Sequence, residues 1–101
     1  MSGLEPHRRR LDVLDQQIIS LLGERFEVCR DVAAHKRAHA IPMMQPERVR
    51  EVRERYVALG TEQRLPADFT VELFELLIAA TCKMEDELIE SISAAPEKSE
   101  R

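Results

Sequence analysis

The sequence feature that most constrains this fold is an unbroken helix-forming stretch that runs from Leu4 to about Ala38. Proline occurs only in its first turn, at Pro6, and Gly23 is its single glycine, so nothing forces a break. Such a helix is about 50 Å long, whereas a compact globule of 101 residues is roughly 35 Å across. The helix therefore extends beyond its own domain, and its apolar overhang predicts packing on a second copy of the chain.

The apolar side of this helix also carries positive charge. Its apolar residues recur at steps of three and four or their sums: Leu11, Leu14, Ile18, Leu22, Cys29 and Val32. Arg25 and Lys36 differ by only about 20° around the helix and lie on this same side. Cations that face a core are unfavourable unless an anion meets them. Two interpretations stay open: salt bridges to internal acidic residues, or a site for an anionic ligand.

A third basic residue, Arg8, lies ~25 Å from Arg25 along the helix axis, so one small molecule cannot contact both in one chain. In an antiparallel dimer, however, Arg8 of one chain can reach the pocket that holds Arg25 and Lys36 of the other. Guanidinium groups bind carboxylates through two hydrogen bonds, and an ammonium acts as a compact charge aimed at one oxygen. Three such cations suit a small dicarboxylate.

Two further helices follow a loop, Ile41–Pro46, in which two prolines bracket Met43, Met44 and Gln45. Pro46 suits the first turn of a second helix, and Gly60 is expected to end that helix after Leu59. A third helix is predicted from about Ala67 to Ile92. The expected fold is all-α, with three helices in the order long–short–long that pair into a dimer. Residues 1–93 form the predicted domain, and residues 94–101 form a disordered polar tail.

Composition excludes several classes of protein. The chain is 44% apolar and 34% charged, and its net charge of −4 argues against nucleic acid as a partner. No apolar run reaches the ~18 residues of a membrane span, and the first ten residues lack a signal-peptide core, so we expect a cytoplasmic protein. Cys29 and Cys82 occupy apolar positions and are interpreted as reduced core residues. A metal site would need more ligands at closer spacing, and none is predicted.

The third helix places Thr81 and Glu85 four residues apart, on one face. Glu85 has three interpretations: a counter-ion of Lys36 or Arg25, a protonated acid whose pKa is raised by desolvation, or an exposed residue of an acidic surface run. Arg48, in the first turn of the second helix, faces either ligand or solvent. From the residues alone, we predict a helical dimer with a dicarboxylate pocket between its subunits.

These residues, in this order and spacing, resemble the all-helical class of chorismate mutases from about Arg8 to Ser91. The resemblance rests on the following positions: Arg8, Leu14-Asp15, Ile18, Leu21-Leu22, Glu24-Arg25, Lys36, Arg48, Gly60, Phe69, Leu73-Phe74 and Thr81. It implies an intertwined homodimeric six-helix bundle with two sites and no metal or cofactor. It also implies a pericyclic Claisen rearrangement that converts chorismate to prephenate.

Carried over residue by residue, the resemblance implies that Arg25 and the partner subunit's Arg8 bind the two substrate carboxylates. Lys36 donates to the ether oxygen of the breaking bond, where negative charge develops, and Arg48 and Thr81 complete the pocket. No proton is transferred and no covalent intermediate forms, so the protein has only to hold the compact conformer and stabilise the dipolar transition state.

Three positions depart from the pattern of the family. Glu85 replaces a Gln that gives the ether oxygen a second neutral donor, so Glu85 serves that role only when protonated. Gln45 replaces an Asp in the loop, and Val49 replaces the Glu that meets the C4 hydroxyl of the substrate.

The loop and the segment from Cys82 to Asp86 look like those of the 4-amino-4-deoxychorismate mutases of antibiotic pathways, which favours that substrate over chorismate. Pro46-Glu47-Arg48-Val49 is also similar to isochorismate-pyruvate lyase, an alternative on the same fold. A non-catalytic regulatory or ligand-binding domain and a purely structural helical dimer remain as further alternatives.

Overall fold

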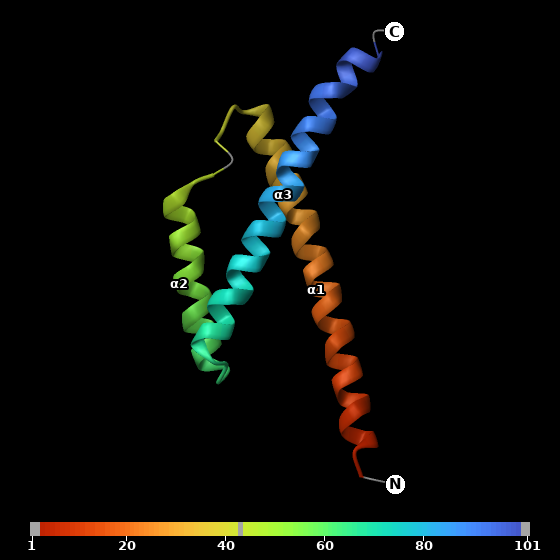
Figure 1. Cartoon of the computed structure of the whole chain (residues 1–101), viewed down its shortest axis with the longest axis vertical. Coiled ribbons are helices and arrows are strands. Elements are labelled where there is room, and N and C mark those ends of the chain that lie inside the picture. Colours follow the sequence, from red (N-terminus) through yellow and green to blue (C-terminus); the bar gives the residue numbers. More distant parts are fainter. Residues whose placement is uncertain (1–2, 43, 100–101) are drawn as a thin grey trace.

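The structure is a computed structural model that describes residues 3–42 and 44–99 (Figure 1). It consists of α1 (Glu5–Ala38), α2 (Pro46–Glu62) and α3 (Ala67–Ser99). The described residues include no strand, so the all-α prediction and the long–short–long order are confirmed. None of the helices in this part of the chain is both long enough and apolar enough to cross a bilayer.

The first helix begins and ends where the sequence predicted. Pro6 lies in the first turn, and after Ala38 the backbone turns at Ala40, whose φ of 53° is in the left-handed region. The amide of Ile41 donates to the carbonyl of Lys36 at 2.8 Å, and the amide of Ala40 donates to that of Arg37 at 3.3 Å. These two bonds form a Schellman motif, which satisfies carbonyls that the last helical turn would otherwise leave unpaired.

The prediction that Gly60 ends the second helix is wrong. The helix continues to Glu62, and its Schellman motif places Arg64, not Gly60, in the left-handed region, with a φ of 61°. Gly60 instead lies buried where α2 meets α3, and a Cβ at this position would approach Thr70 Oγ1 to 2.5 Å. Its lack of a side chain therefore permits close packing of two helices rather than a turn.

The third helix is longer than predicted. Helical backbone extends past Ile92 to Ser99, through a segment in which alanine, glutamate and lysine favour the helical state despite Pro96. The assignment of residues 94–101 to a tail outside the domain stays a prediction, and residues 100–101 lie outside the described residues. Met43 of the loop also lies outside them.

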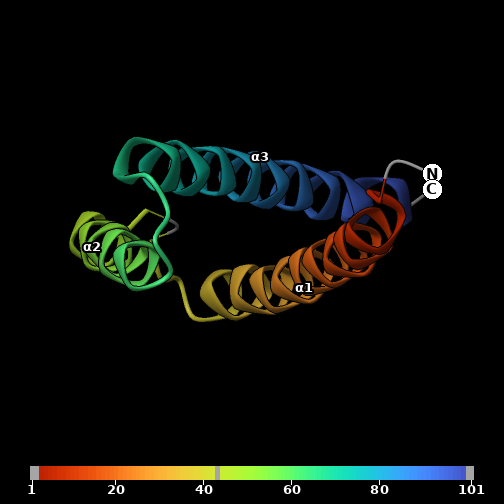
Figure 2. The same ribbon diagram turned by 90° about the horizontal axis from the view of Figure 1, so that it is seen from below.

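The helices form an open arrangement rather than a compact globule. The chain measures 64 × 33 × 16 Å, and its radius of gyration is 18.4 Å, against ~13 Å for a compact chain of this length. In the described part of the chain, α3 packs on both other helices, but α1 and α2 do not pack on each other. Seen from below, α2 lies beside the start of α3, away from the start of α1 (Figure 2).

The core of a single chain is correspondingly small. Among residues 3–42 and 44–88, the buried apolar residues are Ala33 of α1 and Phe74 and Leu77 of α3. Tyr56 of α2 adds an edge-to-face contact with Phe74, at a centroid distance of 5.3 Å. This arrangement of the rings contributes beyond simple burial of apolar area and joins α2 to α3.

The predicted apolar stripe of α1 is largely uncovered within the chain. Every described residue from 3 to 21 is exposed, including Leu11, Leu14 and Ile18 at 56%, 43% and 54%. This exposure is the apolar overhang that the length of the helix predicts. The predicted overhang is confirmed.

Candidate functional site

A cavity of about 580 Å³ lies where the three helices and the α1–α2 loop face one another. Its apolar lining includes Val32 of α1, Val52 of α2 and Ile78 of α3. Its polar and charged lining includes Arg25, Lys36, Gln45, Arg48, Arg55, Thr81 and Glu85. This volume is in the range of small-molecule sites, which combine apolar walls with a few polar groups.

The structure brings together all but one of the residues that the sequence singled out. Arg25, Lys36, Gln45, Arg48, Val49, Thr81 and Glu85 all line the cavity. Arg8 does not line it; this residue is exposed near the start of α1, seventeen residues before Arg25. The helical spacing of the candidates thus predicted which of them line the cavity, and Arg8 is absent from that lining.

On the α1 wall, Arg25 and Lys36 are both half-buried. The guanidinium of Arg25 donates from Nη1 to Cys29 Sγ at 3.8 Å. Arg25 forms no ion pair with an acidic side chain in the part of the chain that the structure describes. For Arg25, the interpretation as one half of an internal salt bridge is therefore wrong. The hydrogen bond to the Cys29 thiol uses only one of its N–H donors, so most of the guanidinium donors are available.

On the α3 wall, Thr81 and Glu85 are only 8% and 6% exposed. The interpretation of Glu85 as an exposed surface residue is therefore wrong. The Thr81 hydroxyl is buried and has no hydrogen-bond partner among the described residues. Buried hydroxyls almost always have a partner, and because Thr81 lines the cavity, a bound molecule is one source of that partner.

Burial also raises the pKa of two side chains on this wall. Desolvation raises the pKa of Glu85 above its ordinary value near 4.5, the ammonium of Lys36 opposes the rise, and Asp86 adds to it. Burial likewise raises the pKa of the Cys82 thiol, with Glu85 and Asp86 contributing. The α3 wall therefore favours neutral hydrogen-bond donors over charged groups.

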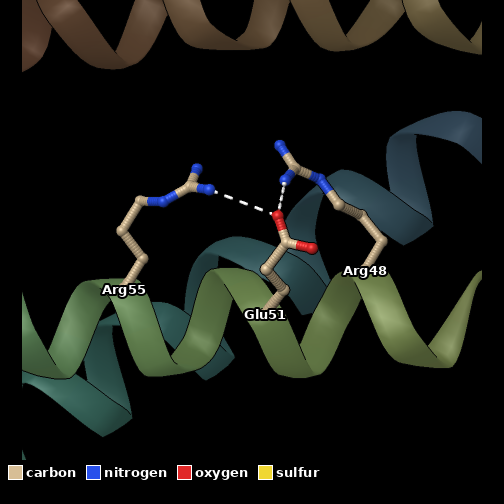
Figure 3. Close-up of polar contacts among 3 residues, drawn as sticks. All are labelled: Arg48, Glu51 and Arg55. Atoms are coloured by element: carbon tan, nitrogen blue, oxygen red, sulfur yellow. Dashed lines mark hydrogen bonds and ion pairs between the residues drawn. The ribbon is translucent and has the colours of Figure 1, made fainter.

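The α2 wall contains a cation that the sequence analysis missed. Arg55 lines the cavity beside Arg48, and both guanidinium groups donate to one carboxylate oxygen, Glu51 Oε1, at 3.2 and 2.7 Å (Figure 3). The signal was present in the sequence, because a spacing of seven residues returns to nearly the same side of a helix.

The two cysteines are free thiols, as predicted, but they are half-buried on the wall of this cavity rather than core residues. Across residues 3–42 and 44–99, no group of three or more histidine, cysteine or acidic side chains is arranged to hold a metal ion. The charged and polar side chains of the lining offer electrostatic chemistry. Cations from α1 and α2 face hydroxyl and carboxyl donors from α3, which suits an anionic molecule whose charge shifts during reaction.

Comparison with known proteins agrees with this chemistry. The family model described as chorismate mutase type II matches residues 7–86. A 4-amino-4-deoxychorismate mutase of Streptomyces pristinaespiralis is 32% identical over 87% of this chain and 68% of its own length. A second protein of that name, from Streptomyces venezuelae, is 32% identical over 82% of this chain and 81% of its own.

A chorismate mutase of Methanocaldococcus jannaschii is 28% identical over 82% of this chain and 84% of its own length. All these matches extend across most of the three helices that build the cavity. The chain therefore belongs to the chorismate mutase type II family, a family of isomerases.

Proposed function

We propose that this protein rearranges 4-amino-4-deoxychorismate to 4-amino-4-deoxyprephenate. The reaction is a Claisen rearrangement in which the ether C–O bond breaks, a C–C bond forms and no atom is gained or lost. The observation that carries this proposal is the cavity itself, in which Arg25 and Lys36 of α1 face Thr81 and Glu85 of α3. Such fixed donors accelerate the reaction by stabilising charge that develops only in the transition state.

Each residue has a defined role in this proposal. Arg25 and Arg48 hold the substrate carboxylates, which keeps the flexible enolpyruvyl group over the ring. The ammonium of Lys36 and the protonated carboxyl of Glu85 donate to the ether oxygen as the bond breaks. The Thr81 hydroxyl, which is buried without a partner among the described residues, gains one in the substrate. Gln45 and Val49 lie at the side that reads the C4 substituent.

The proposed active form is an intertwined homodimer, a six-helix bundle with two sites. Support comes from the exposed apolar residues along the first half of α1, including Leu11 and Ile18. Apolar patches of this extent on a soluble chain indicate an interface. In the dimer, Arg8 of the partner subunit completes the site by binding a carboxylate that Arg25 leaves partly exposed.

The choice of the amino substrate is supported by two curated relatives, each 32% identical to this chain and each named 4-amino-4-deoxychorismate mutase. Chorismate is the second candidate, and a specific observation favours it. Four cations line the cavity, namely Arg25, Lys36, Arg48 and Arg55. A dianion complements this surplus of positive charge better than a substrate that also carries an ammonium group.

The deciding experiment compares chorismate, 4-amino-4-deoxychorismate and isochorismate with purified protein, following both substrate loss and free pyruvate. The proposal expects the highest kcat/KM for the amino substrate and no pyruvate. A higher kcat/KM for chorismate would assign the chorismate reaction instead. Stoichiometric pyruvate from isochorismate would establish a lyase, and binding without turnover of all three would indicate a regulatory domain.

A further inference from the structure

The α2 wall of the cavity contains a pair of arginines that converge on one point. Arg48 Nη1 lies 2.7 Å and Arg55 Nη2 lies 3.2 Å from the same oxygen of Glu51 (Figure 3). The two nitrogens are therefore within about 6 Å of each other, a separation that one carboxylate can bridge. The oxygen of Glu51 marks a point at which an anion meets both guanidinium groups.

The position of this pair on α2 is specific. At about 100° per residue, residues 48, 51 and 55 lie within roughly 60° of one another around the helix. Figure 3 shows their side chains extending from one side of α2 toward the ribbon of α1. Arg48 and Arg55 line the cavity, whereas Arg50 and Arg53, on the other side of α2, do not.

Stability does not explain why two arginines converge here. The three side chains are 51–59% exposed, and ion pairs at such exposure contribute little to folding. Two neighbouring guanidinium groups also repel each other, and Glu51 offsets only one of their two charges. One net positive charge therefore remains at the cavity wall, where an anionic ligand benefits from it.

We propose that Arg55 is a further substrate-binding residue, which together with Arg48 holds an anionic group of the substrate. Glu51 keeps the two guanidinium groups convergent when no substrate is bound. The inference rests on the proposed function. It does not depend on the C4 substituent, because chorismate and 4-amino-4-deoxychorismate both carry the carboxylates that arginine recognises.

The test compares Arg55→Gln with Arg53→Gln, in steady-state kinetics and in calorimetric titration with chorismate. Both variants remove one positive charge from α2, but only Arg55 lines the cavity. Arg55→Gln is expected to raise KM and the Kd for chorismate about tenfold or more, with kcat within about twofold of wild type. Arg53→Gln is expected to change neither constant.

Two further variants sharpen the result. Arg55→Lys keeps the charge but loses the two-pronged geometry, so it should recover only part of the affinity. The double variant Arg48→Gln/Arg55→Gln should lose less than the product of the single losses, because the two residues share one anionic group. Circular dichroism should show unchanged helix content in all variants.

Wild-type affinity of Arg55→Gln for chorismate would overturn the inference. An equal loss of affinity in Arg55→Gln and Arg53→Gln would also overturn it, because such a loss would reflect net charge alone. Absence of turnover by the wild-type protein would contradict the proposed function, while the titration would still decide whether Arg55 contacts the anion.

Discussion

Lys36 of α1 and Glu85 of α3 face each other across one cavity, and the ammonium of Lys36 partly offsets the rise that burial causes in the pKa of Glu85. The two side chains therefore form a coupled pair in which the cation limits how strongly the acid holds its proton. In the proposed reaction, both donate to the same ether oxygen.

Replacing Lys36 by alanine should remove the strongest stabilisation of the developing negative charge. We expect kcat to fall by about 100-fold to 1,000-fold, as for the loss of one donor in comparable sites. The matched control is Lys83→Ala, which removes an exposed lysine of α3 that does not line the cavity. Turnover of Lys36→Ala close to that of Lys83→Ala would contradict the assignment.

The pH dependence of turnover should follow Glu85. Because only the protonated carboxyl can donate a hydrogen bond, kcat should decrease as pH rises through its raised pKa, by about tenfold per unit above it. Glu85→Gln supplies a neutral donor at every pH and should give a flat profile over the same range. Glu87→Gln, an exposed neighbour on α3, should retain the wild-type profile. An unchanged profile in Glu85→Gln would assign the titration to another group.

Folding stability should depend on the same proton. A carboxyl whose pKa is higher in the folded state binds more protons there, so stability falls as pH rises from the ordinary value near 4.5 through the folded value. Glu85→Gln should therefore have a higher Tm than wild type at pH 8, and the difference should shrink toward pH 4. Differential scanning calorimetry at both pH values measures this, and a constant difference would argue against the linkage.

Thr81→Val separates binding from stability. The hydroxyl is buried and has no partner among the described residues, so an isosteric apolar group should leave Tm unchanged or raise it. Substrate binding should nevertheless weaken, with KM rising by about tenfold if the hydroxyl contacts the ligand. A lower Tm together with normal KM would indicate a purely structural hydroxyl.

Mixing two inactive variants tests whether Arg8 acts across the dimer. Arg8→Ala and Lys36→Ala, refolded together, should form heterodimers with one intact site, which restores about a quarter of wild-type activity. Arg25→Ala mixed with Lys36→Ala is the control, because both lesions lie in the site of one chain and neither heterodimer site is intact. If activity recovers in neither mixture, Arg8 does not act in the site of the partner subunit.

The helical pattern predicted which residues line the cavity because a helix fixes which residues share a face. Arg25 and Lys36, eleven residues apart, and Thr81 and Glu85, four apart, line the cavity for that reason. Arg55 was missed because its spacing of seven residues places it on the same side of α2 as Arg48 but does not show whether that side faces a ligand or solvent. Its place in the cavity wall beside Arg48 shows which way it faces.

The helix ends were predicted less well, because local preference competes with packing. Gly60 is a favourable residue for a helix end, but the approach of Thr70 requires a residue without a side chain, and that contact is not visible in sequence. The left-handed positions are instead occupied by Ala40 and Arg64, whose hydrogen-bonded turns compensate for the unfavourable backbone angle.

The contact of Gly60 with Thr70 lies where α2 and α3 meet. From that end the two helices diverge toward the start of α2 (Figure 1). In this V-shaped arrangement, a small change of spacing at the vertex becomes a larger displacement at the open end. Arg48, three turns from Gly60, moves with that end. The width of the cavity is therefore set in part by a residue that does not line it, and its dimensions can change in evolution without any substitution in the lining.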